Sequence, residues 1–229
     1  MAKVSLAEHM QDRPDPQSEQ EANAGPFITI SREFGCWGFS LGLLLLDILN
    51  EESTAEEGFW KIYHKEVVGR LAEETNVDIE VLEQQRRTKP RMIAEFFRSF
   101  GRKEDIPSGI EVRNRIGEII RGLAMEGHAI IVGQGGAGAT HDLSNGISIR
   151  LEAPEEWRVK QIAFREGLSE TEARLRIQAE EREKDYLKKI YQTRFPRKPA
   201  FHLVYDCSVF SLAQIAQHVV YAMKLKKVI

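Results

Sequence analysis

The sequence has 229 residues, which is enough for one α/β domain of ordinary size with a complete hydrophobic core. Apolar residues make up 42% and charged residues 29% of the chain, which excludes a fully disordered, a collagen-like or a disulfide-scaffold protein. The 35 acidic residues nearly balance the 32 basic ones, so the net charge of -3 predicts no nucleic-acid partner. Two cysteines are too few for a disulfide framework and suit a reducing cytoplasm.

The first 25 residues are rich in Asp, Glu, Gln and Pro and contain no apolar run of the kind that a signal peptide requires. We therefore expect a flexible N-terminal tail over 1–25 and a single domain over 26–229. The longest apolar stretch, 41–49, includes Gly42 and Asp47 and is far shorter than the roughly 20 residues of a membrane span. The sequence therefore predicts a cytoplasmic protein that has no membrane partner.

After the tail, β-favouring segments alternate with helical ones. The predicted strands are 27–30, 59–62, 129–132, 147–151 and 201–205. The predicted helices are 40–50, 65–75, 78–87, 90–100, 110–126, one that opens at 153–154, 169–190 and 211–226. The run 129–132 is apolar without alternation, as in a central strand covered on both faces. Five short strands separated by helices predict a parallel sheet between two layers of helices.

Two glycine-rich turns follow predicted strands, one with Gly35 and Gly38 and one over 133–138. Ligands of open parallel sheets bind at the C-terminal ends of the strands, so both turns are predicted to lie on the ligand-binding edge. The N–H groups of such a turn and of the next helix can bind a phosphate, although an ordinary strand-to-helix turn contains the same glycines. Arg32 and Glu33 stand beside the first turn, where they either serve the site or pair with each other or with neighbouring side chains.

The run 28–35 (ITISREFG) resembles the start of the cytidylate kinase-like family, P-loop proteins related to the nucleoside monophosphate kinases, in which a strand is followed by S-R-E-[FY]-G-S-G-G-R and a helix. Further matches follow in the family's order. Residues 127–133 are similar to its G-x-x-[VI]-I-[VI]-G-R strand, 149–158 to its I-R-x-x-A-P-x-x-x-R segment and 165–173 to the start of its lid. The resemblance extends over about residues 26–225.

The resemblance implies a P-loop NTPase-like three-layer α/β sandwich with a parallel sheet of about five strands. It places a monophosphate-binding side at about 63–100 and a helical lid at about 160–190. The implied activity is transfer of the γ-phosphoryl group of ATP to CMP or a similar nucleoside monophosphate, with Mg²⁺ as the metal. This chemistry depends mainly on positioning and on electrostatic stabilisation. The implied partner is a nucleotide or another phosphate ligand, and a homodimer remains possible.

The resemblance also assigns residues to three parts of a site. The loop that would hold the phosphates of ATP comprises Arg32, Gly35, Cys36, Trp37, Gly38, Phe39 and Ser40, and the hydroxyl of Ser40 would bind Mg²⁺. The arginines that would stabilise the transferring phosphoryl group are Arg158, Arg165 and Arg182. The residues implied on the substrate side are His64, Gly133 and Gln134.

The sequence departs from the family pattern at positions where charge is expected. Trp37 replaces a glycine of the loop, Phe39 replaces its basic residue, and Gln134 and Gln161 replace arginines. The remaining departures are His64 in place of Asp, and Glu181 and Lys184 near the positions of the lid's D-x-x-R pair. Loss of one preorganised charge donor typically lowers a rate by about 10²–10³-fold. The alternative function is therefore an inactive sensor or interaction module that binds a nucleotide or another anion, and a third is an interaction protein that has lost the ligand.

Several candidates also have an ordinary structural interpretation. Trp37 could cover the core, and Ser40 could cap the helix. Arg158 could be solvated or salt-bridged, and we expect Arg150, within a predicted strand, to form a structural ion pair. Cys36 precedes a helix N-terminus, which lowers a thiol pKa, but no His or second Cys stands near it in the sequence. The sequence therefore gives little support to a reactive thiol.

Overall fold

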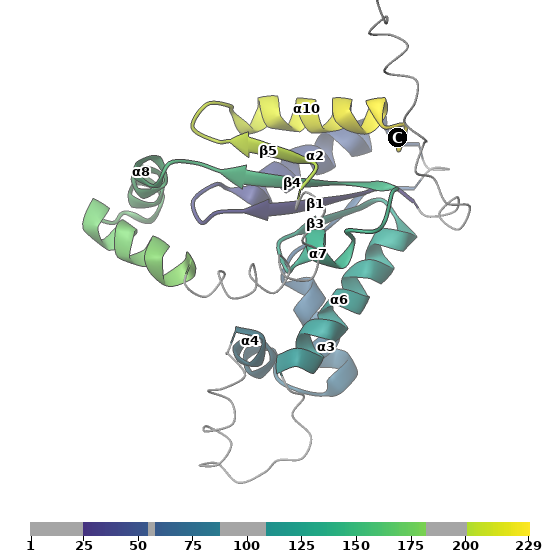
Figure 1. The fold of residues 1–229 in the computed structure, drawn as a ribbon, viewed down its shortest axis with the longest axis horizontal. Helices are drawn as coiled ribbons and strands as arrows, with labels where there is room; N and C mark the ends of the chain where they lie inside the picture. The colour runs from purple at the N-terminus through teal and green to yellow at the C-terminus, as the bar shows by residue number, and fades with distance from the viewer. Residues whose placement is uncertain (1–24, 55–57, 88–108, 182–200) are drawn as a thin grey trace, which may run out of the picture.

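The computed structural model describes residues 25–54, 58–87, 109–181 and 201–229 (Figure 1). Strands and helices alternate along these residues. The elements are β1 (Phe27–Arg32), α2 (Gly38–Glu52), β2 (Lys61–Tyr63), α3 (Glu66–Thr75), α4 (Ile79–Arg87), α6 (Gly109–Glu126), β3 (Ala129–Val132), α7 (Gly136–Ala139), β4 (Gly146–Glu152), α8 (Glu155–Glu166), β5 (Leu203–Asp206) and α10 (Leu212–Leu225). Residues 170–181 form a further helix after α8.

The five strands form one parallel sheet in the order β2-β3-β1-β4-β5. The central strand β1 pairs with β3 on one side and with β4 on the other, so that Ile28 lies opposite both Ile130 and Ile147. From β1 the chain crosses to β2 on one side, whereas β4 leads to β5 on the other side. Because the connections diverge between β1 and β4, the C-terminal ends of these strands form the switch point at which open α/β sheets bind ligands.

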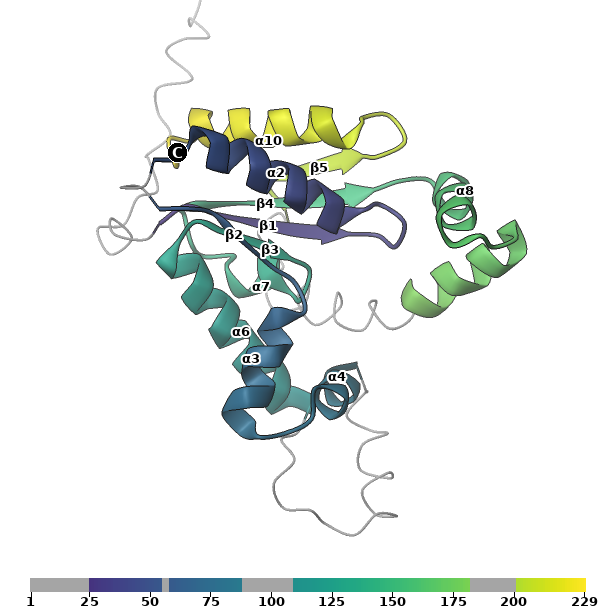
Figure 2. The same cartoon turned by 180° about the vertical axis from the view of Figure 1, so that it is seen from behind.

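Helices cover both faces of this sheet (Figures 1 and 2). On one face, α2 and α10 pack against each other, and Leu45 of α2 and Val219 of α10 are fully buried. On the other face, α6 and α7 contact β1, and α3 packs on α6. All residues of β3 are buried because both faces of this strand are covered. The predicted three-layer α/β sandwich with a parallel sheet of five strands is confirmed.

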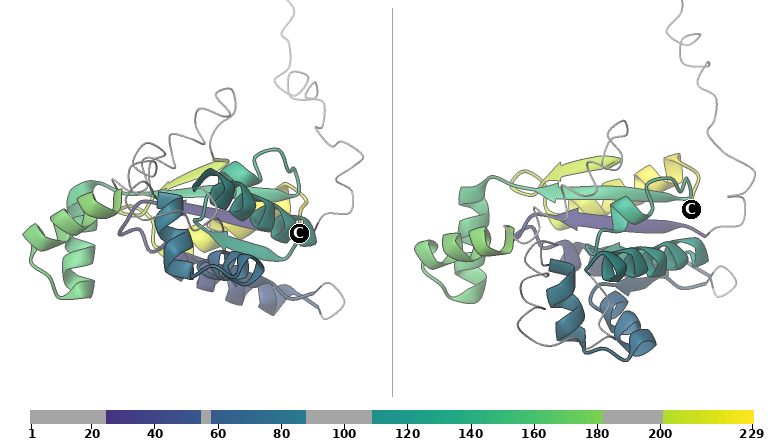
Figure 3. Two further views of the ribbon diagram at one scale, coloured as in Figure 1. Left: turned by 90° about the horizontal axis from the view of Figure 1, so that it is seen from below. Right: turned by 60° about the horizontal axis from the view of Figure 1, so that its bottom comes forward.

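A pair of helices projects beyond the C-terminal ends of the strands (Figures 1 and 3). The first, α8, ends at Gly167, which has a φ of 68°. The second, at 170–181, begins after Ser169, which exchanges hydrogen bonds with Glu172 as the capping-box spacing predicts. We call this pair, residues 155–181, the lid helices, because they cover most of the described part of the predicted lid.

Some predicted boundaries differ from those in the structure. Strand β2 begins at Lys61 rather than at 59, because the backbone N–H and C=O of Trp60 bond the side chain of Asn50 instead of another strand. The turn predicted over 133–138 becomes a short helix, α7, from Gly136 onward. The predicted helix at 90–100 lies outside the described residues. Within the described ranges, no helix combines the length and the hydropathy needed to cross a membrane.

Candidate functional site

The β1–α2 loop, residues 33–37, leaves the central strand at the switch point and enters α2. Gly35 has a φ of 97°, and a Cβ atom there would lie only 3.1 Å from the Cβ atom of Arg158, so the loop lies directly against α8. Trp37 caps α2 in a left-handed conformation (φ 46°, ψ 40°) that is unfavourable for a bulky residue, and its side chain bonds no N–H of the helix. The first-turn N–H groups of a helix have no intrahelical partner and favour an anion.

The lid helices pack on two aromatic side chains of this loop. The guanidinium carbon of Arg165 lies 4.2 Å from the ring centre of Trp37, and that of Arg176 lies 5.7 Å from the ring centre of Phe34. Both rings also pack against a small apolar cluster inside the lid, which includes Ile162. Trp37 therefore occupies a position where the family pattern has glycine and connects the loop to the lid. Its unfavourable backbone is compatible with the fold because the ring packs against Arg165 and this cluster.

Arg158 of α8, predicted to be catalytic, is buried between the loop and the second lid helix. Its side chain is 7% exposed, and its Nε donates to the backbone oxygen of Ala153 at 3.0 Å. Its Nη1 donates to the backbone oxygen of Phe34 at 3.3 Å and to the carboxylate of Glu181. The carboxylate of Glu33 lies 3.4 Å from Nε. In this arrangement the charge of Arg158 is balanced by two carboxylates of the protein.

Glu33 connects the loop to the end of β4. Its carboxylate accepts a hydrogen bond from the N–H of Ala153 at 3.2 Å and lies 3.7 Å from Nη2 of Arg150. Arg150 in turn donates to the hydroxyl of Ser31 at 2.9 Å and to the carboxylate of Glu152 at 3.1 Å. Arg150 thus forms a structural ion pair, as expected. Glu33 pairs with neighbouring arginines, which was one of the two interpretations that the sequence left open.

On the other side of the loop, Arg32 contacts two residues of the predicted substrate side. Its Nη2 donates a hydrogen bond to Nε2 of His64 at 3.0 Å. A Cβ atom at Gly133 would lie 2.0 Å from Nη1 of Arg32, so only glycine leaves room for the guanidinium. The ring of Phe39 lies 5.7 Å from the ring of His64. The structure therefore brings Arg32, His64, Gly133 and Phe39 together.

Backbone geometry also shapes this side of the site. The N–H of His64 donates to the carboxylate of Glu66 at 2.7 Å. Hydrogen bonds from the backbone N–H groups of Glu66 and His64 hold the pKa of the Glu66 carboxyl below its usual value. Gln134 follows Gly133 with a left-handed φ of 58° and is half-buried. The turn after β3 therefore lies beside the C-terminal end of β1, on the edge of the sheet where both glycine-rich turns were predicted.

The remaining predicted residues have different positions. The side chain of Cys36 is fully buried in the core, so this residue can reach a ligand only through its backbone. Its hydrogen bond with Cys207 and its burial raise the pKa of the Cys36 thiol, contrary to the lowering that a helix N-terminus would cause. Ser40 is half-buried in the first turn of α2. Arg182 lies outside the described residues.

Three features of the site were not predicted from the sequence: the contact of Phe34 with Arg176, the pairing of Glu181 with Arg158, and the proximity of Cys207 to Cys36. Each joins segments that are far apart in the chain. A signal existed only for Glu181, because it lies near the acidic position of the family's lid motif. Among the described residues, no group of three or more His, Cys, Asp or Glu side chains is arranged to hold a metal ion.

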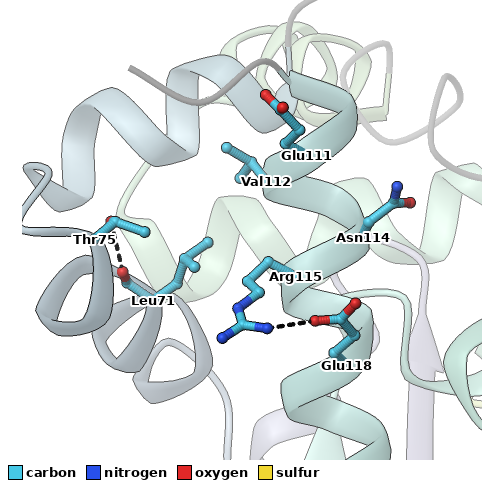
Figure 4. Close-up of a pocket in the computed structure, with 7 residues that line it drawn as sticks. All are labelled: Leu71, Thr75, Glu111, Val112, Asn114, Arg115 and Glu118. Carbon is cyan, nitrogen blue, oxygen red and sulfur yellow. Dashed lines mark hydrogen bonds and ion pairs between the residues drawn. The ribbon is translucent and has the colours of Figure 1, made fainter. Parts of the chain in front are cut away.

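A separate pocket of about 360 Å³ lies between α3 and α6 (Figure 4). Leu71 of α3 and Val112 of α6 are buried beside it, and an ion pair of 2.7 Å between Arg115 and Glu118 lies along α6. The other lining residues are Thr75, Glu111 and Asn114. None of the predicted site residues lines this pocket, and its lining comes from helices rather than from the C-terminal ends of the strands.

Comparison with solved structures finds matches of low sequence identity. An uncharacterized protein from Eubacterium ventriosum ATCC 27560 is 18% identical, with 87% of this chain and 98% of that chain covered and a TM-score of 0.56. A shikimate kinase from Acinetobacter baumannii, in complex with shikimate, is 14% identical, with 91% and 98% covered and a TM-score of 0.45. TT1252 from Thermus thermophilus is 16% identical, with 87% and 98% covered and a TM-score of 0.46. No curated protein matches the sequence.

The comparison with protein families gives a match over most of the chain. The cytidylate kinase-like family matches residues 27–209, a range that begins with β1 and ends shortly after β5. It therefore includes the β1–α2 loop, the lid helices and every strand of the sheet. The predicted resemblance is confirmed: this chain belongs to the cytidylate kinase-like family.

Proposed function

We propose that this chain binds a nucleotide with its phosphates at the β1–α2 loop and transfers the γ-phosphoryl group of ATP to CMP or a similar nucleoside monophosphate. The observation that supports this proposal is the position of the loop, directly after the central strand and at the switch point of the sheet. The chain belongs to the cytidylate kinase-like family. Trp37 leaves the N-terminal turn of α2 without a side-chain cap, and such a turn favours phosphate oxygens.

In this proposal the two sides of the loop have different roles. Arg165 already lies against the loop through Trp37, so a short movement of the lid would bring it to the phosphates. Arg176 lies against Phe34 but also pairs with Glu166 at 2.6 Å, so it would first have to leave this carboxylate. Arg32 and His64 would receive the acceptor phosphate on the other side. Arg158 would join the transferring group only after exchanging a carboxylate partner for a phosphate oxygen.

Among the residues assigned to the loop, Ser40 in the first turn of α2 offers a hydroxyl for Mg²⁺. This limited donor set fits Mg²⁺, which keeps several waters and takes other ligands from substrate phosphates rather than from a protein cage. When bound, the ion would neutralise charge on the phosphates. Glu33 is a poor additional ligand because its carboxylate already faces Arg150, Arg158 and the N–H of Ala153.

A second candidate function is nucleotide binding without phosphoryl transfer. Two observations favour it. The ring of Phe39 occupies the position of the family's basic residue and packs near His64, so no charge is supplied there. Arg158 is neutralised by Glu33 and Glu181. Both candidates require nucleotide binding at the same loop, and they differ only in turnover.

The test begins with thermal unfolding of the full chain in the presence of ATP·Mg²⁺, CMP, dCMP and UMP, each alone and in pairs. A ligand at 100 times its dissociation constant adds about 2.7 kcal/mol to the free energy of unfolding, which raises the midpoint by several degrees. A coupled assay for ADP release then measures turnover. Stabilisation with turnover supports the transferase, and stabilisation without turnover supports the second candidate. No stabilisation by any nucleotide would overturn both.

Phe39→Lys tests the location of the phosphates. A hydrogen bond to a charged group contributes about 1.5–3 kcal/mol, so we expect this variant to bind ATP·Mg²⁺ at least about tenfold more tightly. Leu43→Lys is the matched control, because Phe39 and Leu43 lie one turn apart on α2 and are each 41% exposed. Equal effects of the two substitutions would contradict a phosphate site at the loop.

A further inference from the structure

Two cysteines meet directly behind the β1–α2 loop. Cys36 belongs to the loop, and its side chain is fully buried in the cluster between the sheet and helices α2 and α10. Cys207 follows the last residue of β5 and is 8% exposed. The thiol of Cys207 donates to the backbone oxygen of Cys36 at 4.0 Å, so the two cysteines lie side by side. Both are free thiols in this structure.

The backbone holds the two cysteines in this position. The N–H of Glu33, three residues before Cys36, donates to the oxygen of Leu151 at 3.0 Å. The N–H of Cys207 donates to the oxygen of Glu152, the next residue of β4, at 2.8 Å. The C-terminal end of β4 therefore anchors both cysteine-bearing segments. Their proximity follows from the sheet and does not depend on a flexible side chain.

The two thiols are not equivalent. A hydrogen bond from Cys36 lowers the pKa of Cys207, whereas the hydrogen bond with Cys207 and burial raise the pKa of Cys36. Cys207 is therefore the thiol that is more favourable as a thiolate, and it is also the more exposed of the two. A thiolate is the form of cysteine that reacts with oxidants.

We propose that Cys36 and Cys207 are a redox modification site that forms a reversible intramolecular disulfide on reaction with a hydroperoxide. The thiolate of Cys207 attacks the peroxide, the O–O bond breaks, and a sulfenic acid forms with release of hydroxide or alkoxide. The thiol of Cys36 then attacks the sulfur of Cys207, an S–S bond forms, and water leaves. In total two thiols are oxidised and the hydroperoxide is reduced to water and an alcohol, or to two waters when it is hydrogen peroxide.

The bond would act on the candidate phosphate loop. Closing it shortens the separation of the sulfurs to about 2.05 Å and draws residues next to Gly35 and Trp37 toward β5. This consequence rests on the proposed function, because it concerns the N–H groups that would bind phosphate. We expect the oxidised protein to bind ATP·Mg²⁺ several-fold more weakly than the reduced protein.

The primary experiment needs no nucleotide. The reduced full chain is treated with hydrogen peroxide, quenched with an alkylating reagent and examined by intact mass and by non-reducing electrophoresis. We expect a monomer that has lost two hydrogens, resists alkylation and recovers both thiols with dithiothreitol. The unfolding midpoint of this species should rise by several degrees, since the bond closes a loop between residues 171 apart.

Two variants test the order of the steps. Cys36→Ser keeps a small polar group and leaves Cys207 alone, so Cys207 should stop at a sulfenic acid that a carbon nucleophile such as dimedone traps. Cys207→Ala leaves Cys36, which should react much more slowly. Faster reaction of Cys36 than of Cys207 would overturn the assigned order.

Other results would overturn the proposal itself. One is a native protein that keeps both thiols under conditions that oxidise the unfolded chain, and another is a product linked between two chains. Nucleotide affinity is measured afterwards on both redox forms. Equal nucleotide affinities of the two redox forms would overturn the coupling of the disulfide to the loop. Absence of nucleotide binding by the reduced protein would overturn the proposed function. The thiol measurements remain valid in either case.

Discussion

The central sheet and the lid helices bury apolar side chains in different ways. In the sheet, helices cover both faces, and residues such as Ile130 and Leu45 are fully enclosed by neighbours from several elements. In the lid, the buried residues are few, and the cluster is completed by Phe34 and Trp37 from the β1–α2 loop. The sheet is therefore stabilised mainly by the helices that cover it, whereas the stability of the lid depends on the loop that it covers.

Arg150 beside the sheet and Arg165 in the lid have different kinds of partner, although Arg158, Arg174 and Arg176 of the lid also pair with carboxylates. Beside the sheet, Arg150 is held by Ser31, Glu33 and Glu152 at the end of β4. In the lid, Arg165 lies on the aromatic ring of Trp37. An anion that enters the loop can attract Arg165 directly, because the guanidinium of this arginine lies on an aromatic ring. This difference makes the lid the region that a phosphate ligand is expected to move.

The largest expected effect tests how much the buried core of the sheet contributes to the free energy of unfolding. Ile130→Ala removes a fully buried side chain from β3, so we expect a loss of about 2–5 kcal/mol in the free energy of unfolding. Ile110→Ala is the matched control because Ile110 is 55% exposed, and it should change stability by less than about 0.5 kcal/mol. Urea unfolding measures both. Similar losses in the two variants would contradict the burial pattern.

Arg158 joins the two regions, so its removal should affect both. Arg158→Met keeps an apolar stem but leaves Glu33 and Glu181 without this cation, and we expect a loss of about 3 kcal/mol. Hydrogen exchange should increase in the loop and in the lid helices together. Glu181→Gln, which removes only the partly exposed partner, should have a smaller effect. A loss confined to the lid would show that Arg158 does not support the loop.

Trp37→Gly is expected to affect the lid helices more than the sheet. Glycine relieves a left-handed backbone that costs about 1–2 kcal/mol in other residues, which offsets part of the lost packing and cation–π contact. We therefore expect a change of less than about 1 kcal/mol in global stability, with hydrogen exchange about tenfold faster over 155–181. Arg174→Ala removes two exposed ion pairs within the lid and serves as the control. Unchanged exchange in the Trp37 variant would contradict the dependence of the lid on the loop.

The smallest expected effect lies on the sheet side, at the exposed pair of Arg121 and Asp142. Hydrogen bonds from Arg121 lower the pKa of the Asp142 carboxyl below its ordinary value of 3.8. The resulting stability is therefore present above pH 3.8 and lost as the pH falls through the lowered pKa. Because the side chains are 40% and 45% exposed, Asp142→Asn should cost less than about 1 kcal/mol at neutral pH. If the free energy of unfolding of Asp142→Asn still differed from that of the parent protein at pH values below the lowered pKa, this cause would be contradicted.

Much of the fold could be predicted because it depends on local patterns. The apolar run of β3 predicted a central strand, and the spacing of Ser169 and Glu172 predicted the start of the second lid helix. The position of β2 was less predictable, because the side chain of Asn50 binds the backbone of Trp60 and displaces the start of the strand. Propensity within a segment contains no information about such a contact.

The candidate site was predicted in its location but not in its pairings. Glycine-rich turns after two strands placed the site at the C-terminal edge of the sheet, and Arg32 does meet His64 and Gly133 there. The partners of Arg158 and Trp37 could not be predicted, because several of these contacts join segments that are far apart in the chain. Ion pairs and stacking contacts of this kind depend on the directions in which separate elements approach each other.

The sequence by itself determined the alternation of strands and helices, the parallel sheet and the family, because hydrophobic periodicity and ordered motifs are properties of the chain. Only the tertiary structure decided that Arg158 is neutralised, that Trp37 holds the lid and that Cys36 meets Cys207. The physical reason is that pairing energies and pKa values depend on distance and burial, and both arise only when β1, β4, β5 and the lid helices are brought to one edge of the sheet.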